Sequence, residues 1–232
     1  MKQIGINDIS KYLEWDFENL EYIVKKQIKE KNIYTEILEN NIVDDKLLLK
    51  NTFDITLEQY PHINTVGDNV IKQSIKQSEC IKDMVFKSIE NRNGFKINFV
   101  ENECENINHI NLAKRYVKEF NNLIYKYKVS DIYCNRVLIY SDNNYSFIGH
   151  IDVLVKTNQG YIQVEIKTSR INYVEKYNAQ LYLNKKLIEV NKDIKIKESF
   201  ILNIREQQVF LASTELSKKE QFTLLQSARH YW

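Results

Sequence analysis

Apolar and polar residues alternate most clearly in two short segments, 147–155 and 161–167. Both segments are rich in β-branched residues, and the polar turn between them, 157–160, ends in glycine. This pattern predicts two β-strands joined as a hairpin. In the second strand, the period of two places Glu165 and Lys167 on one face, because alternate side chains of a strand point the same way.

In the first strand, the same period places His150, Asp152 and Leu154 on one face. The residues between them are expected on the other face: Phe147, Gly149, Ile151, Val153 and Val155. Residues paired across a hairpin have a constant sum of residue numbers, and a turn centred on 158–159 makes that sum 317. Asp152 and Glu165 also sum to 317. Their Cβ atoms are therefore expected to lie about 5 Å apart.

Two carboxylates so placed repel each other, and their pairing predicts a cation between them. The available ligands are oxygens, from Asp152, Glu165 and the backbone carbonyl of Ile166. Such ligands suit a hard divalent ion, Mg²⁺ or Mn²⁺. The ion would polarise a phosphoryl oxygen and activate water, while the ammonium of Lys167 would stabilise negative charge on the phosphate. The chemistry that fits is hydrolysis of a phosphodiester.

The alternative is a role without chemistry. An Asp followed by Glu-x-Lys occurs by chance in many proteins, and Glu165 with Lys167 would then be a surface ion pair of little energetic value. The context favours the metal site, because Asp152 lies in an otherwise apolar strand. A charged residue in such a strand normally needs a partner.

The same residues resemble the PD-(D/E)XK nuclease superfamily, and more closely its RecB-like branch, which includes phage-type exonucleases. In that branch Gly-x-x-Asp, Asp/Glu-x-Lys-Thr and a helix with a Gln recur in order, and here they are 149–152, 165–168 and Gln180. The similarity covers about residues 106–213. It implies an α/β fold with a restriction-endonuclease-like core, in which a mixed central β-sheet is flanked by helices.

By this resemblance Asp152 and Glu165 are catalytic metal ligands, Lys167 is catalytic, and Gln180 contacts DNA. One departure concerns the helix after the motif. Many relatives carry a Tyr four residues after the Gln, where this chain has Asn184. DNA engagement near that helix is therefore expected to differ.

A second departure concerns an upstream helix, which in many relatives supplies a His or Glu to the metal. The matching region of this chain, 67–75, offers isoleucine at the corresponding positions. Glu79 lies two turns after Ile71 and is the candidate for the missing metal ligand. The alternative for Glu79 is a solvated helix face.

Four further residues near the motif are candidates for contact with nucleic acid. His150 shares a strand face with Asp152, although a packing histidine is an equal alternative. Thr168 and Arg170 directly follow the catalytic motif, and Lys176 belongs to a lysine-rich stretch that extends to residue 197. Such a stretch supplies phosphate contacts, or else forms a solvated helix face.

The 232 residues suit a single nuclease domain, 1–232, with enough length for a full hydrophobic core. We expect a mainly helical N-terminal part, 1–105, and the catalytic core in 106–232. The N-terminal helices are predicted at 4–34 and 66–89, with an irregular segment at 51–64. In the core the expected elements are an amphipathic helix at 112–127, a strand at 136–140, and a second hairpin of 199–202 with 208–211.

Overall charge gives no indication of a nucleic-acid partner, because 33 Lys and Arg oppose 31 Asp and Glu. Cys80, Cys104 and Cys134 are scattered without a C-x-x-C pair, so zinc or iron–sulfur binding is not expected and the thiols are predicted to be reduced. The N-terminus lacks the apolar segment of a secretion signal. We expect an intracellular protein, in the cytoplasm or a DNA-containing compartment such as a mitochondrion.

The sequence thus predicts a Mg²⁺-dependent deoxyribonuclease, an exonuclease acting on DNA ends in replication, recombination or repair. Its partner would be DNA, and a homo-oligomer or a recombination or replication protein remains open as a second partner. One alternative is a structure-specific or restriction-type endonuclease that uses the same residues. Another is a catalytically inactive nuclease fold that serves as a DNA-binding or assembly subunit.

Overall fold

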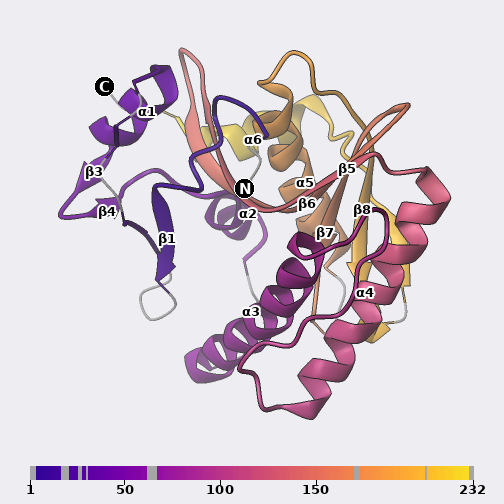
Figure 1. Ribbon diagram of the computed structural model, residues 1–232. Helices are drawn as coiled ribbons and strands as arrows, with labels where there is room; N and C mark the ends of the chain where they lie inside the picture. The colour runs from indigo at the N-terminus through magenta and orange to yellow at the C-terminus, as the bar shows by residue number, and fades with distance from the viewer. Residues whose placement is uncertain are drawn as a thin grey trace.

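The protein is α/β, with helices packed against a mixed β-sheet and a smaller antiparallel sheet near the N-terminus (Figure 1). The computed structural model describes residues 4–16, 21–25, 28–29, 31–61, 67–169, 173–206 and 208–229. Within these ranges there are six α-helices and two sheets. No helix in the described part of the chain is long and apolar enough to cross a membrane.

The mixed sheet has the strand order β5-β6-β7-β8-β9. Its strands are β5 Asp131–Ser141, β6 Ser146–Thr157, β7 Gly160–Ile166, β8 Ile196–Asn203 and β9 Gln208–Leu211. All neighbours are antiparallel except β7 and β8, which are parallel and connected by helix α5, Val174–Glu189. A short 3-10 helix, η1 Ile204–Glu206, joins β8 to β9. The predicted mixed sheet and the predicted second hairpin are both confirmed.

The β6–β7 hairpin has the predicted register. Its pairs extend from Thr157 with Gly160 to Val153 with Val164, and every pair sums to 317. Gly160 has a φ of 126°, a conformation that L side chains rarely adopt, so the turn requires glycine at this position. The turn therefore sets the register of the whole hairpin.

Two helices cover one face of the mixed sheet, α3 Asp68–Glu90 and α4 Ile107–Tyr127 (Figure 1). They bury the apolar face of β7, as the alternation predicted: Ile162, Val164 and Ile166. The opposite face packs against α5, α2 Thr52–Gln59 and α6 Lys218–Gln226. The predicted helices at 66–89 and 112–127 are thus confirmed as α3 and α4.

The prediction of a helix over 4–34 is wrong. The described residues of this segment contain strands β1 Leu13–Asp16 and β2 Glu21–Val24. These pair in a four-stranded antiparallel sheet with β3 Ile42–Val43 and β4 Lys46–Leu47. The helix at 33–40, α1, begins only after the capping residue Asn32. The apolar residues before it follow mixed spacings because they pack against β5 and β6 rather than forming one helical stripe.

The prediction of an irregular segment at 51–64 is also wrong where the structure describes it, because α2 occupies most of it. The side chain of Asn51 caps this helix by accepting from the backbone N–H of Asp54 at 2.9 Å. The helix ends before Pro61, which disfavours helical backbone in Tyr60. The described part of residues 1–105 thus contains a small sheet of four short strands besides three helices.

The face assignment of β6 holds only up to Asp152. Leu154, expected to share the face of His150 and Asp152, packs instead on the α5 side of the sheet. Val153 and Val155 lie on the opposite side, in the core beneath α3 and α4. Side chains of β6 thus change faces directly after Asp152.

This change has a local cause in β5. Asn135 has a φ of 53°, in the left-handed region, and lies between two regular pairs, Cys134 with Val153 and Arg136 with Ile151. The irregularity rotates both strands without altering their register. It lies directly opposite Asp152, beside the polar cluster described below.

The expectation of three reduced cysteines is wrong for two of them. Cys80 of α3 and Cys104, which precedes α4, form a disulfide. Cys134 is buried and free, as expected. The two bonded cysteines are far apart in sequence but adjacent in space, because the connection between α3 and α4 returns along α3.

Candidate active site

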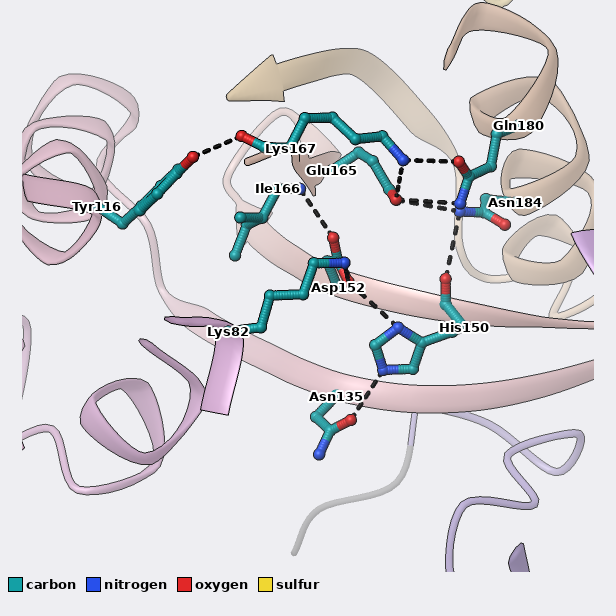
Figure 2. A network of polar contacts seen from close by, with 10 residues as sticks. All are labelled: Lys82, Tyr116, Asn135, His150, Asp152, Glu165, Ile166, Lys167, Gln180 and Asn184. Atoms are coloured by element: carbon teal, nitrogen blue, oxygen red, sulfur yellow. Dashed lines mark hydrogen bonds and ion pairs between the residues drawn. The ribbon is translucent and has the colours of Figure 1, made fainter. Parts of the chain in front are cut away.

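Asp152 lies in β6 with its side chain fully buried. Its carboxylate has three polar neighbours (Figure 2). Oδ1 lies 2.9 Å from Nζ of Lys82 and 3.1 Å from Nδ1 of His150. Oδ2 accepts a hydrogen bond of 2.8 Å from the backbone N–H of Ile166. A carboxylate in an apolar strand thus obtains the partners that its burial requires.

The site lies where β6 and β7 separate. The hairpin pairing ends at Val153 and Val164, and Asp152 and Glu165 hold the next position of that register. β6 continues beside β5, and β7 continues beside β8. The side chain of Asp152 replaces one backbone acceptor at this fork by binding the N–H of Ile166. The predicted direct pairing of Asp152 with Glu165 lies one position beyond the last pair of this ladder, and it stays a prediction.

Glu165 lies at the centre of a second set of hydrogen bonds, on the α5 side (Figure 2). Its Oε1 accepts from Nζ of Lys167 at 2.9 Å and from Nε2 of Gln180 at 3.0 Å. Oε1 of Gln180 accepts from the same Lys167 ammonium at 2.7 Å. Asn184, one turn further along α5, lies 3.4 Å from Oε2 of Glu165. The structure therefore brings Glu165, Lys167 and Gln180 into direct contact.

The position of Lys167 is set by its backbone. Its N–H donates to the carbonyl of Leu202 in β8 at 2.9 Å, and its carbonyl accepts from the hydroxyl of Tyr116 in α4. The ammonium also lies 4.7 Å from the centre of the Tyr177 ring. Contacts from α4, β8 and α5 thus place this side chain. Tyr116 was not identified from the sequence, because its role depends on a contact across 51 residues of chain.

Lys82 was also missed by the sequence analysis. It lies in α3 and is largely buried, with 11% of its side chain exposed. A signal was present, since Lys82 shares a helix face with Val85 and Ile89, which belong to the core. A lysine at a core position of an amphipathic helix indicates a buried acidic partner. That partner is Asp152, 70 residues away in sequence.

Glu79, the candidate for the upstream metal ligand, lies one turn before Lys82 on α3 and is partly exposed. Burial alone would lower the pKa of Lys82, but the negative charges of Asp152, Glu165 and Glu79 outweigh it and raise that pKa. Glu79 therefore lies close enough to Lys82 to act on its charge. Its candidate role as a ligand remains a prediction.

The two acidic residues are shifted in opposite directions. Burial acts to raise the pKa of Asp152, but Lys82, His150 and Lys167 outweigh it and hold that pKa well below its usual range. For Glu165, burial and the neighbouring charge of Asp152 raise the pKa above its ordinary value, against the positive charges of Lys167 and Lys82. Asp152 is thus the group held as a carboxylate, and Glu165 is the one more easily protonated.

The ammonium groups of Lys82 and Lys167 balance the charges of these carboxylates in the structure, and the predicted divalent cation stays a prediction. The donors nevertheless suit a hard divalent ion, since both side chains end in oxygens. Oδ1 of Asn184, beside Glu165, is buried and has no hydrogen-bond partner. An unpartnered buried oxygen at this point fits a site that takes up a further donor or a cation.

The remaining predicted residues differ in their surroundings. His150 contacts Asp152, as predicted, and its Nε2 lies 2.8 Å from Oδ1 of Asn135. Thr168 is buried. Lys176 is also buried and lies 4.6 Å from the centre of the Phe53 ring, and burial with the charge of Lys167 lowers its pKa to about 8.

The other predicted DNA contact, Arg170, lies outside the described residues. The N-terminal sheet also extends to the site. Tyr22 of β2 is buried, and its pKa is raised by burial and by the charges of Glu79 and Asp152, against the charge of Lys82. This residue was not expected near the site, because the sequence analysis placed it in a helix.

Comparison with known proteins provides no identity for this chain. No protein-family model matches it, and no curated protein matches it. The solved structures that match include the crystal structure of SSO0001, which aligns over 84% of both chains with 11% sequence identity and a TM-score of 0.33. A likeness of this size carries no argument about fold or function.

Proposed function

We propose that this protein is a metal-dependent deoxyribonuclease that removes nucleotides from DNA ends. The observation that carries the proposal is the convergence of four residues, Asp152, Glu165, Lys167 and Gln180, at the fork between β6 and β7. Their order and spacing also led to the nuclease resemblance. A chance Glu-x-Lys motif has no reason to lie beside a second buried carboxylate.

The arrangement of elements supports the same proposal. An amphipathic helix, α4, precedes the antiparallel strands β5, β6 and β7, and the crossover helix α5 then leads to β8 and β9. This is the order expected of a restriction-endonuclease-like core. We propose that fold for residues 106–232, with the N-terminal sheet and α1 to α3 shaping a DNA channel.

The proposed metal ligands are the carboxylates of Asp152 and Glu165, with the backbone carbonyl of Ile166 and, as a further candidate, Glu79. Mg²⁺ or Mn²⁺ bound there would supply positive charge to a phosphoryl oxygen of the scissile phosphate. Lys82 would have to release Asp152 when the ion binds, since its ammonium contacts Oδ1.

Lys167 is the residue best placed to act on the phosphate. Glu165 and Gln180 hold its ammonium at 2.9 and 2.7 Å, which fixes a donor beside the two carboxylates. In this position it would orient the attacking water and stabilise the charge that develops on the phosphate. Gln180 is nearly buried and directed at Glu165 and Lys167, which favours a positioning role over direct contact with DNA.

A second candidate function is favoured by one contact. Lys82 already neutralises Asp152, so the folded protein has a balanced charge without a metal ion. A nuclease fold that has lost catalysis, and serves as a DNA-binding or assembly subunit, would be stabilised by such a pair. The proposal of an active enzyme and this alternative therefore differ in whether metal displaces Lys82.

The decisive experiment compares linear DNA, labelled at one end, with closed circular DNA, in the presence of Mg²⁺ or EDTA. Wild type is compared with Lys167→Ala, and Lys218→Ala serves as the control because Lys218 is exposed at the start of α6. We expect Mg²⁺-dependent loss of the linear DNA alone. Lys167→Ala should abolish it, and Lys218→Ala should leave it unchanged.

Other results would point elsewhere. Nicking of the circular DNA would support a structure-specific or restriction-type endonuclease that uses the same residues. DNA binding without cleavage, in Mg²⁺ and in Mn²⁺, would refute the catalytic proposal and support the inactive alternative. Cleavage that survives in Lys167→Ala would show that the site lies elsewhere.

A further inference from the structure

A second cluster of metal-ligating side chains lies outside the candidate active site. Cys80, Cys104 and His109 have their sulfur and nitrogen atoms within 4.8 Å of one another. The Sγ of Cys104 lies 3.7 Å from Nδ1 of His109. The three residues come from the middle of α3, the segment before α4, and the first turn of α4. All three are partly exposed, so an ion from solvent can reach them.

We propose that these three residues bind a zinc ion when the cysteine pair is reduced. Two thiolates and one imidazole are ligands that zinc prefers, and a water molecule would complete a tetrahedral site. The Cα atoms of Cys80 and Cys104 lie 6.5 Å apart, close enough for both sulfurs to reach one ion. The proposal does not depend on the proposed nuclease function.

Neighbouring contacts hold the ligands in place before any ion binds. The side-chain amide of Asn102 donates to Asp83 on α3 at 2.7 Å and to the carbonyl of Cys80 at 3.4 Å. Its Oδ1 accepts from the backbone N–H of Cys104 at 2.9 Å. Asn102 thus fixes the Cys104 segment against α3. A site whose ligands are positioned by outer contacts loses little conformational freedom when the ion binds.

The disulfide and the ion are alternative occupants of the same two sulfurs. In the disulfide both sulfurs are bonded to each other, and neither is a thiolate. Reduction by a phosphine and water breaks the S–S bond, gives two thiols, and converts the phosphine to its oxide. The two thiols then lose their protons when zinc binds. The oxidation state of the pair would therefore decide whether the site can hold metal.

The test uses Co²⁺ as a spectroscopic substitute for zinc in the phosphine-reduced protein, residues 1–232. Thiolate-to-cobalt charge transfer absorbs in the near ultraviolet and is not produced by oxygen ligands, so ion binding at Asp152 and Glu165 does not contribute. We expect a saturable band at one ion per chain, which excess Zn²⁺ removes. Protein with an intact disulfide should not show it.

The variants distinguish this site from general thiol binding. Cys80→Ser and Cys104→Ser should abolish the band, whereas Cys134→Ala, which alters the buried free thiol, should retain it. Removing an outer partner of a metal ligand typically lowers metal affinity by roughly 10–100-fold. His109→Ala removes a ligand itself, so it should lower the affinity for Co²⁺ by at least as much. As a second measurement, Zn²⁺ should raise the melting temperature of the reduced wild type but not of Cys80→Ser.

Two outcomes would overturn the proposal. One is the absence of the charge-transfer band in reduced, folded wild type. The other is a band that persists at full strength in Cys80→Ser or Cys104→Ser.

Discussion

The pairing of Lys82 with Asp152 leads to a quantitative prediction for Lys82→Met. Methionine keeps most of the apolar chain of lysine, one atom shorter, but removes the charge opposite a fully buried carboxylate. Removing one partner of a buried ion pair typically costs about 3–5 kcal/mol, because the other charge is left uncompensated. Asp152 retains His150 and the N–H of Ile166, so we expect the lower end, about 3 kcal/mol.

The stability that Lys82→Met loses should depend on pH in a defined direction. The pKa of Asp152 is held low, so this carboxylate contributes stability above its unfolded pKa, and that contribution is lost as pH falls through the folded pKa. In Lys82→Met the charge of Lys82 no longer opposes the effect of burial, so we expect the folded pKa of Asp152 to rise above that of an unfolded aspartate and Asp152 to take up a proton more readily. The difference in the free energy of unfolding between wild type and Lys82→Met should therefore be largest near pH 7. It should shrink toward about pH 4, near the unfolded pKa of an aspartate.

Urea denaturation at these two pH values measures the effect. Lys87→Met is the matched control, because Lys87 lies on the same helix and forms an exposed ion pair with Asp83. Such a pair contributes only about 0.3–0.5 kcal/mol. A Lys82→Met deficit no larger than that of the control would refute the reasoning, as would a deficit that grows on acidification.

Two further predictions concern the packing and charge of the same region. A Cβ atom at Gly149 would lie 2.3 Å from a side-chain atom of Leu187 and 2.7 Å from one of Thr52. Gly149→Ala should therefore lower the free energy of unfolding by about 1–3 kcal/mol. Urea denaturation measures this, and an unchanged midpoint would contradict the prediction. The pKa of Lys176 is lowered from 10.5 to about 8 by burial and by Lys167, so between these values the folded state loses a proton that the unfolded state keeps. Wild type should therefore gain stability relative to Lys176→Met as pH rises from 8 to 10, and a flat difference would refute the shift.

The parts of the candidate site that the sequence predicted are those set by residues close together in the chain. The turn that ends in Gly160 sets the β6–β7 register, and strand alternation directs Glu165 and Lys167 to one face. Gln180 follows on the next helix and contacts both residues. These features depend on the period of a strand and the geometry of one turn, which a short stretch of sequence contains.

The partners of this cluster were not predicted because they come from distant parts of the chain. Lys82 and Tyr116 reach the site across 70 and 51 residues, and Tyr22 arrives from a sheet that the sequence analysis interpreted as helix. Hydrophobic spacing indicates which face of a helix is buried. It does not indicate which strand that face will meet.

The sequence by itself determined the acidic residues and the lysine of the candidate site, the hairpin that carries them, and the alternation that puts Glu165 and Lys167 on one face. Tertiary structure decided how their charges are balanced, where β6 changes faces opposite Asn135, and that Cys80 meets Cys104. The physical reason is the range of the interactions. Turn and strand preferences act over a few residues, whereas buried charges and sulfur pairs depend on which elements pack together.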